Sequence, residues 1–118
     1  MRRDRKTLGA ILAMAAVLAG AVLLAWPSPQ AGTELVVVVP EGTRARIDAG
    51  EPVELLPRLL EVRVGDSLVI INQDDATHQV GPYIVGPQQR LEQRFTIPGR
   101  IDGICTLHPS GQVAIVVR

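Results

Sequence analysis

Beyond Thr33 the chain never sustains the 3.6-residue apolar repeat of an amphipathic helix, and this limits its fold more than any other feature. Short runs rich in Val and Ile alternate there with Gly, Pro, Asp and Asn. Leu60, Val62 and Val64 alternate with charged residues, which is typical of a half-buried strand. The remaining expected strands include Leu35–Val39, Leu68–Asn72, the segment starting at His78, Leu91–Ile97 and Val113–Val117. About seven such strands predict an all-β antiparallel sandwich. Residues 44–57 fit either an irregular excursion or a short helical turn.

A different pattern occupies the N-terminus. Leu8–Trp26 is 19 residues long and has no charge, and four basic residues precede it. As a helix it would reach roughly 28 Å, close to the thickness of a bilayer. The positive-inside rule then leaves the N-terminus in the cytoplasm and the remainder outside. We therefore predict a single N-terminal transmembrane helix, although a cleaved secretory signal would also export the remainder.

The sequence divides accordingly. Residues 1–7 form a basic cytoplasmic N-terminus, residues 8–26 the transmembrane anchor or uncleaved signal, residues 27–33 a linker and residues 34–118 the folded domain. After Trp26 there are eight basic and eleven acidic side chains and no basic run, which argues against nucleic-acid binding. The single cysteine excludes an internal disulfide and any cluster that needs several thiolates.

Three side chains beyond the anchor are candidate metal ligands. Cys105 and His108 are three residues apart and directly precede the last strand, so a tight loop would let both reach one ion. His78 starts an earlier strand, which a sandwich could bring to the same end. A thiolate and two imidazoles with a weak axial group form a blue-copper ligand set, and zinc is the alternative. Without a metal, the buried cysteine would be an inert small hydrophobe and each histidine a satisfied loop residue.

The order of these residues resembles a known family. Val64-Gly65-Asp66 leads into Leu68–Asn72, and His78 follows. Then come Phe95, Pro98-Gly99 and Cys105-Thr106-Leu107-His108-Pro109. This arrangement is similar to the cupredoxin (blue-copper) family over roughly residues 34–118. The resemblance implies a Greek-key β-sandwich with one copper ion near one end, held by His78, Cys105 and His108.

The chain departs from the family pattern at several positions. Cupredoxins commonly have an axial Met shortly after the second His, but the two methionines here are Met1 and Met14. Gln112 stands in that region, and its amide resembles the axial ligand of stellacyanin. An axial oxygen favours oxidised copper, so we expect a lower reduction potential than with Met. Ile101 and Gly103 also replace aromatic residues often found before the cysteine.

These features predict a membrane-anchored copper-binding protein whose domain is extracytoplasmic (periplasmic or extracellular). Its expected role is one-electron transfer with a redox partner protein, rather than catalysis as a stand-alone enzyme. Copper buffering or delivery and a metal-free interaction module are the alternatives. Asp74 and Asp75 read most simply as a solvated loop, although a docking patch for a basic partner would also use them.

Overall fold

The structure is a computed structural model that describes residues 32–118. The predicted anchor at residues 8–26, the residues before it and most of the linker lie outside this range. No helix among the described residues is long and apolar enough to cross a membrane. The elements in chain order are β1 (Glu34–Val39), α2 (Thr43–Asp48), β2 (Leu59–Val62), β3 (Ser67–Asn72), β4 (His78–Val80), β5 (Tyr83–Val85), β6 (Arg90–Arg94), β7 (Gly99–Ile104) and β8 (Gln112–Val117).

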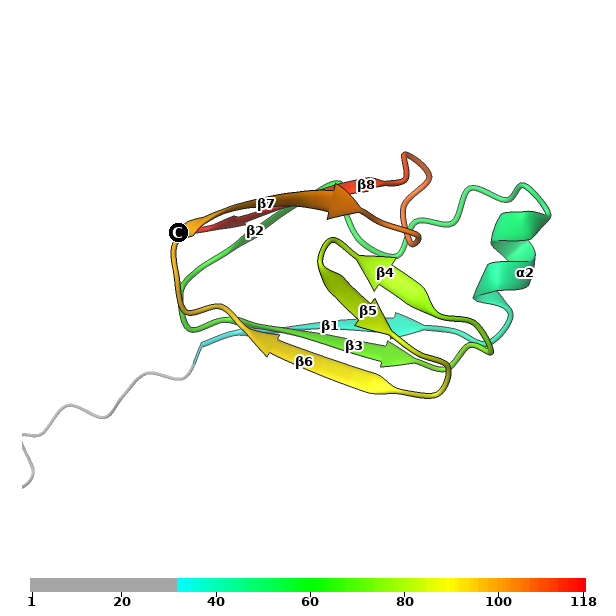
Figure 1. Cartoon of the computed structure of the whole chain (residues 1–118), viewed down its shortest axis with the longest axis horizontal. Helices are drawn as coiled ribbons and strands as arrows, with labels where there is room; N and C mark the ends of the chain where they lie inside the picture. The colour runs from blue at the N-terminus through cyan, green and yellow to red at the C-terminus, as the bar shows by residue number, and fades with distance from the viewer. Residues whose placement is uncertain (1–31) are drawn as a thin grey trace, which may run out of the picture. The chain divides into compact units, whose positions relative to one another are not determined.

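Two three-stranded sheets face each other and form a β-sandwich, as the sequence predicts (Figure 1). One sheet has the order β1-β3-β6 and the other the order β2-β8-β7. The inward side chains of both sheets share one core, to which β3 contributes Leu68 and Ile70 and β8 contributes Ile115 and Val117. The core therefore consists mainly of packed Val, Ile and Leu side chains and contains few aromatic residues.

The prediction of a purely antiparallel sandwich is wrong for two strand pairs. β1 pairs with β3 in parallel, and β2 pairs with β8 in parallel, whereas β3–β6, β4–β5 and β7–β8 are antiparallel. The reason lies in the connections, because the chain leaves β1, crosses to the opposite sheet as β2 and returns as β3. The chain reverses direction once between β1 and β2 and again between β2 and β3, so β1 and β3 run in the same direction. Such a crossover connection is what parallel neighbouring strands require.

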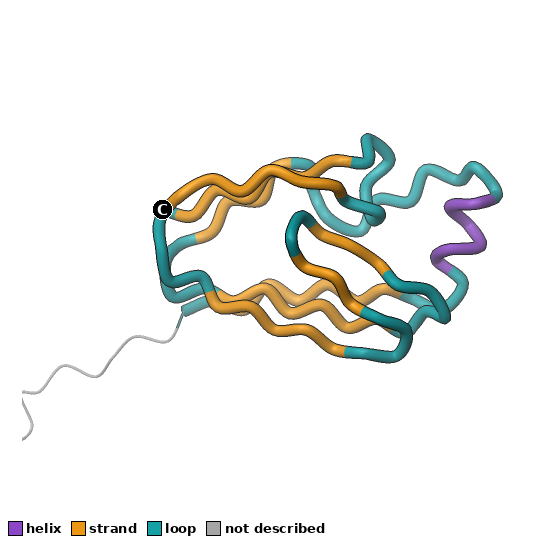
Figure 2. The backbone as a smooth tube through the Cα atoms, in the orientation of Figure 1, coloured by secondary structure: helices purple, strands orange, loops and turns teal. Residues whose placement is uncertain are grey.

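β4 and β5 form a separate hairpin beside the two sheets (Figure 2). Tyr83 on β5 meets Phe95, just after β6, with ring centroids 6.4 Å apart and planes at 64°. This edge-to-face geometry is a favourable arrangement for two aromatic rings. It links the hairpin to the β1-β3-β6 sheet, while β4 approaches β7 on the other side.

The segment between β1 and β2 contains the short helix α2, so of the two possibilities for residues 44–57 the helical turn is present at their start. Gly42 precedes it in a left-handed conformation with φ of 83°, and the Thr43 hydroxyl donates to the Pro40 carbonyl at 2.6 Å. Gly50, also with φ of 83°, follows the last turn and donates to the Ile47 carbonyl at 2.9 Å. The helix lies at the end of the sandwich opposite the C-terminus (Figure 1).

Candidate metal centre

Cys105 directly follows β7 and is fully buried. It forms an isolated bridge with Val80 of β4, and the Thr106 amide donates to the Gln79 carbonyl at 2.9 Å. This close approach requires glycine, because a Cβ atom on Gly103 would lie 2.7 Å from the Gly81 Cα. The cysteine therefore lies beside the strand that His78 begins.

The electrostatic surroundings of the thiol favour its neutral form in the absence of a cation. Burial raises the pKa of Cys105, and the backbone N–H groups of Leu107 and His108 act in the opposite direction by bonding to the sulfur. A bound cation would remove the cost of burying the thiolate, since metal binding requires the deprotonated ligand.

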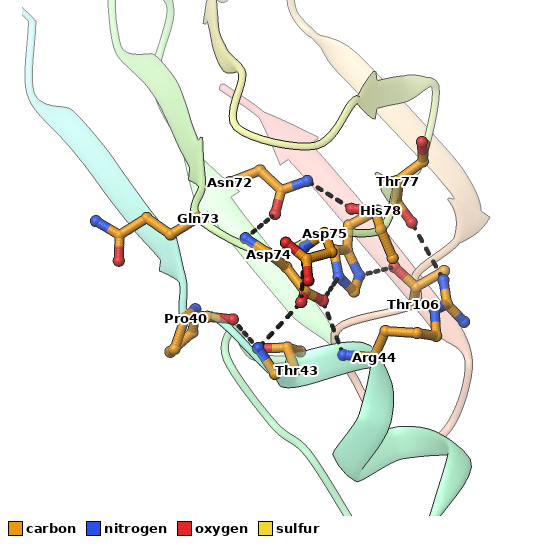
Figure 3. A network of polar contacts seen from close by, with 12 residues as sticks. Pro40, Thr43, Arg44, Asn72, Gln73, Asp74, Asp75, Thr77, His78 and Thr106 are labelled. Atoms are coloured by element: carbon orange, nitrogen blue, oxygen red, sulfur yellow. Dashed lines mark hydrogen bonds and ion pairs between the residues drawn. The ribbon is translucent and has the colours of Figure 1, made fainter.

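His78 is fully buried, and both nitrogens of its ring have protein partners (Figure 3). Nε2 lies 2.7 Å from Oδ2 of Asp74, and Nδ1 lies 3.2 Å from the Thr106 hydroxyl oxygen. The imidazole therefore contacts the residue that immediately follows Cys105. This contact agrees with the expectation that His78 and the Cys-x-x-His segment meet at one end of the sandwich.

His108 has a different orientation. Its Nδ1 accepts the Ser110 amide N–H at 3.0 Å and lies 2.7 Å from the Ser110 hydroxyl oxygen. Its Nε2 is 3.4 Å from Oε1 of Glu54, and the side chain is 15% exposed. Both nitrogens of His108 thus face groups other than Cys105 and His78.

Gln112, the predicted axial ligand, is the exposed first residue of β8. Its amide oxygen accepts a hydrogen bond from Nη2 of Arg58 at 3.1 Å. The side chain lines a surface pocket together with Arg58, Arg100 and Asp102, and not the pocket next to the cysteine. Axial ligation by Gln112 therefore stays a prediction that requires release from Arg58.

Within residues 32–118, no three His, Cys, Asp or Glu side chains are grouped closely enough to hold a metal ion. The donor types nevertheless fit copper, because a buried thiol and imidazole nitrogens match its preference for soft and borderline ligands. His78 lies next to the cysteine segment, and His108 would have to exchange its Ser110 contacts for the ion. The ligand assignment therefore stays a prediction based on donor chemistry and chain position.

A surface pocket of about 510 Å³ adjoins the candidate ligands. One wall comes from α2 and the residues after it, including Ile47 and Val53, and the other from the segment that contains Cys105, His108 and Pro109. The α2 segment thus lies over the side of the site where His108 is partly exposed.

The residues that hold His78 in place are not among those predicted from the sequence. Asp74 is 2% exposed, so the solvated-loop interpretation is wrong for Asp74, although Asp75 is exposed. The available signal was the spacing Asn72-x-Asp74, which permits an Asx turn, and here the Asp74 amide donates to Oδ1 of Asn72 at 3.0 Å. Thr106 carried no such signal.

Comparisons with known proteins gave similarities to solved structures only. Neither the protein-family models nor the curated proteins gave a match. A purple cupredoxin from Nitrosopumilus maritimus is 22% identical with a TM-score of 0.43, and the alignment covers 70% of this chain and 98% of that one. A mutant of amicyanin in its reduced Cu(I) form is 23% identical with a TM-score of 0.44, covering 80% and 88% respectively. At these values the function has to be inferred from the residues of this chain.

Proposed function

We propose that this protein binds one copper ion through His78, Cys105 and His108 and transfers single electrons between redox partner proteins. Copper bound there would supply a one-electron Cu(I)/Cu(II) couple. A reduced partner would donate the electron and an oxidised partner would accept it. The proposal rests on the cupredoxin-like order of residues and on the fit of the donor types to copper.

The contact between His78 and Thr106 is the observation that carries this proposal. Nδ1 of His78 lies 3.2 Å from the hydroxyl oxygen of Thr106, the residue next to Cys105, although His78 and Cys105 are 27 positions apart in the sequence. The buried side chains of His78 and Cys105 lie at the start of β4 and directly after β7, and the Gly81 amide donates to the Ile104 carbonyl at 2.7 Å between these two segments. A site that gains and loses an electron has to keep its geometry. Side chains on or next to strands are held more rigidly than side chains on long loops, which suits such a site.

His108, the pocket beside it and residues 8–26 would each contribute to this function. His108 would give up its contacts with Ser110 to bind the ion, and its exposed edge would face the partner. The pocket beside it is lined by both apolar and charged side chains, among them Ile47 and Val53 and also Arg44 and Glu51. Residues 8–26 would anchor the domain on the extracytoplasmic side of the membrane, where diffusion toward partners is confined to a plane.

The absorption spectrum of the full chain with one equivalent of Cu(II) tests the proposal. We expect an intense charge-transfer band near the red end of the visible range, because a thiolate would be bound to copper. Cys105→Ser should abolish this band and leave the circular dichroism of the sandwich unchanged. A band that survives Cys105→Ser would remove the thiol from the ligand set. Copper binding without the band would instead favour buffering or delivery of copper.

The role of Gln112 is tested by the reduction potential of the copper-loaded protein. Gln112→Met should raise the potential, because a thioether in place of an axial oxygen favours the reduced ion. The control is Gln93→Met, the same substitution on β6, which should leave the potential unchanged. Equal potentials in wild type and Gln112→Met would show that the amide stays with Arg58 and does not bind copper.

One observation favours a second candidate function, a metal-free interaction module. Each nitrogen of His78 and of His108 already has a protein partner, at distances from 2.7 to 3.4 Å. A sandwich that never binds metal would keep these contacts. Calorimetric titration with Cu(II) and with Zn²⁺ that detects no binding of either ion would support this function.

A further inference from the structure

Asp74 is a buried carboxylate that accepts hydrogen bonds from several directions at once. Oδ1 accepts the amide N–H groups of Gly42 at 3.0 Å and Asp75 at 2.9 Å. Oδ2 accepts the Arg44 amide at 2.8 Å and lies 2.7 Å from Nε2 of His78. Figure 3 shows the carboxylate between the start of α2 and the imidazole. Because three partners are backbone groups, the position of the carboxylate is fixed by the fold.

The hydrogen bonds around this carboxylate match its ionised form. Both oxygens accept backbone N–H groups, Oδ1 from Gly42 and Asp75 and Oδ2 from Arg44, so neither oxygen is free to carry a proton. An ionised carboxylate has no proton to donate, so its hydrogen bond with His78 requires a proton on Nε2.

The partner of the other nitrogen is consistent with this assignment. The Thr106 hydroxyl oxygen accepts the Gln79 amide N–H at 3.0 Å. Its single proton has two acceptors within reach, the Gln79 carbonyl oxygen at 3.4 Å and Nδ1 of His78 at the shorter distance of 3.2 Å. In the neutral imidazole the lone pair is then on Nδ1, on the side of Thr106 and the adjacent Cys105. A carboxylate behind a histidine commonly fixes the tautomer and ring orientation of a metal ligand in this way.

We propose that Asp74 is the positioning residue of the candidate site: its carboxylate holds the proton on Nε2 of His78 and so directs the Nδ1 lone pair toward the cysteine segment. This inference rests on the proposed function. The same carboxylate binds the turn that begins α2, so His78 and one wall of the neighbouring pocket are held by a single side chain.

The side-chain nitrogens of His78 in the metal-free full chain test the tautomer directly. Long-range proton–nitrogen correlation spectra in mildly alkaline solution should show a proton on Nε2 and a lone pair on Nδ1. In Asp74→Asn, the amide oxygen can accept the backbone N–H groups of Gly42 and Asp75, while the amide nitrogen takes the place of Oδ2, loses the bond from the Arg44 amide and faces His78 as a donor. We therefore expect the variant to shift toward the Nδ1-protonated tautomer.

If Asp74 only stabilised the fold, its substitution would not change which nitrogen of His78 carries the proton. Asp75→Asn is the matched control, because it removes the adjacent exposed carboxylate and should leave the His78 tautomer unchanged. A wild-type protein with the proton on Nδ1 would overturn the proposal, even if Asp74→Asn does not fold. A folded Asp74→Asn protein that keeps the wild-type tautomer would overturn it as well.

Copper affinity separates this inference from the proposed function. Asp74→Asn should weaken Cu(II) binding by roughly 10- to 100-fold, the usual effect of losing a residue behind a metal ligand. Asp75→Asn should change the affinity by less than about twofold, as expected for an exposed position. Equal affinities of wild type and Asp74→Asn would overturn the inference. A wild-type protein that binds no copper would overturn the proposed function, and the tautomer of His78 would still decide whether Asp74 positions the ring.

Discussion

Asn72, the last residue of β3, stabilises the loop that contains Asp74 through side-chain hydrogen bonds. It is 1% exposed, and its amide nitrogen donates to the carbonyl oxygens of Ala76 at 2.8 Å, Gly86 at 2.9 Å and Val85 at 3.3 Å. Its amide oxygen accepts the Asp74 amide. One side chain thus joins the loop after β3 to the end of β5, and no buried side-chain polar atom in residues 32–118 is left without a partner.

Replacing this residue should cost more than an ordinary loop substitution. Asn72→Ala removes the partner of the buried Asp74 amide N–H and of carbonyl groups that are buried or partly buried, so we expect the free energy of unfolding to fall by about 1–3 kcal/mol. Gln73→Ala, at the exposed neighbouring position, should change it by less than about 0.5 kcal/mol. Chemical denaturation of the two variants measures the difference, and similar midpoints would show that Asn72 does not brace the loop.

The candidate ligands could be identified from the sequence, but their hydrogen-bond partners could not. Cys105 and His108 are close in sequence, so their proximity is a local property of one loop. The contact between His78 and Thr106 instead depends on which strands meet at the end of the sandwich. The burial of Asp74 could not be predicted for a related reason. An aspartate in a polar turn is usually exposed, and Asp74 is buried because the start of α2 lies against it.

At the level of elements, strands with alternating or continuous apolar residues could be predicted well. β1, β3 and β8 begin within one residue of the expected positions and end where expected. β7 was not predicted, because Gly99 and Gly103 leave it without an apolar repeat. Parallel pairing was also missed, since the same alternation fits either direction and the partner is decided by crossovers between sheets.

Gly103, one of the two glycines that leave β7 without an apolar repeat, also allows β7 to approach β4 closely. Gly103→Ala would place a Cβ atom 2.7 Å from the backbone of Gly81, which cannot move aside as a flexible side chain could. We expect a loss of roughly 1–3 kcal/mol in the free energy of unfolding, together with faster amide exchange at Gly81 and Thr106. Thermal denaturation and hydrogen exchange measure the two effects.

Gly86→Ala provides the control for this substitution. There the nearest atoms, 2.6 Å from the added Cβ, belong to the end of the flexible Gln89 side chain. This side chain can rotate away, so the loss of stability should be smaller than for Gly103→Ala. Equal stability of Gly103→Ala and the wild type would show that the close approach of β4 and β7 is not required.

Considered as a whole, the sandwich has a polar connection at the end away from α2, where the C-terminus lies (Figure 1). The carboxylate of Asp66 accepts the amide N–H of Thr33 at 2.9 Å and that of Arg63 at 2.8 Å. Thr33 precedes β1 in one sheet, and Arg63 follows β2 in the other. Asp66 therefore ties the two sheets together at the end opposite the α2 segment.

This connection predicts a specific dependence of stability on acid. Hydrogen bonds from the Arg63 and Thr33 amides hold the pKa of Asp66 below its ordinary value of 3.8, so the ionised carboxylate stabilises the folded state. Its contribution is fully present above the ordinary pKa and is lost as the pH falls through the lowered pKa. Asp66→Asn should thus be less stable than the wild type at neutral pH, and the difference should shrink in acid.

Urea denaturation of both proteins over a series of pH values measures this difference. The control is Asp48→Asn at the exposed end of α2, which should be close to the wild type in stability at neutral pH. A stability difference between Asp66→Asn and the wild type that stays constant from neutral to strongly acidic pH would show that the charge of Asp66 does not join the sheets. Because Asp66 lies at the opposite end from Cys105, its loss should lower stability without changing the spectrum expected for the copper-loaded protein, which separates the folding of the sandwich from the assembly of the proposed metal site.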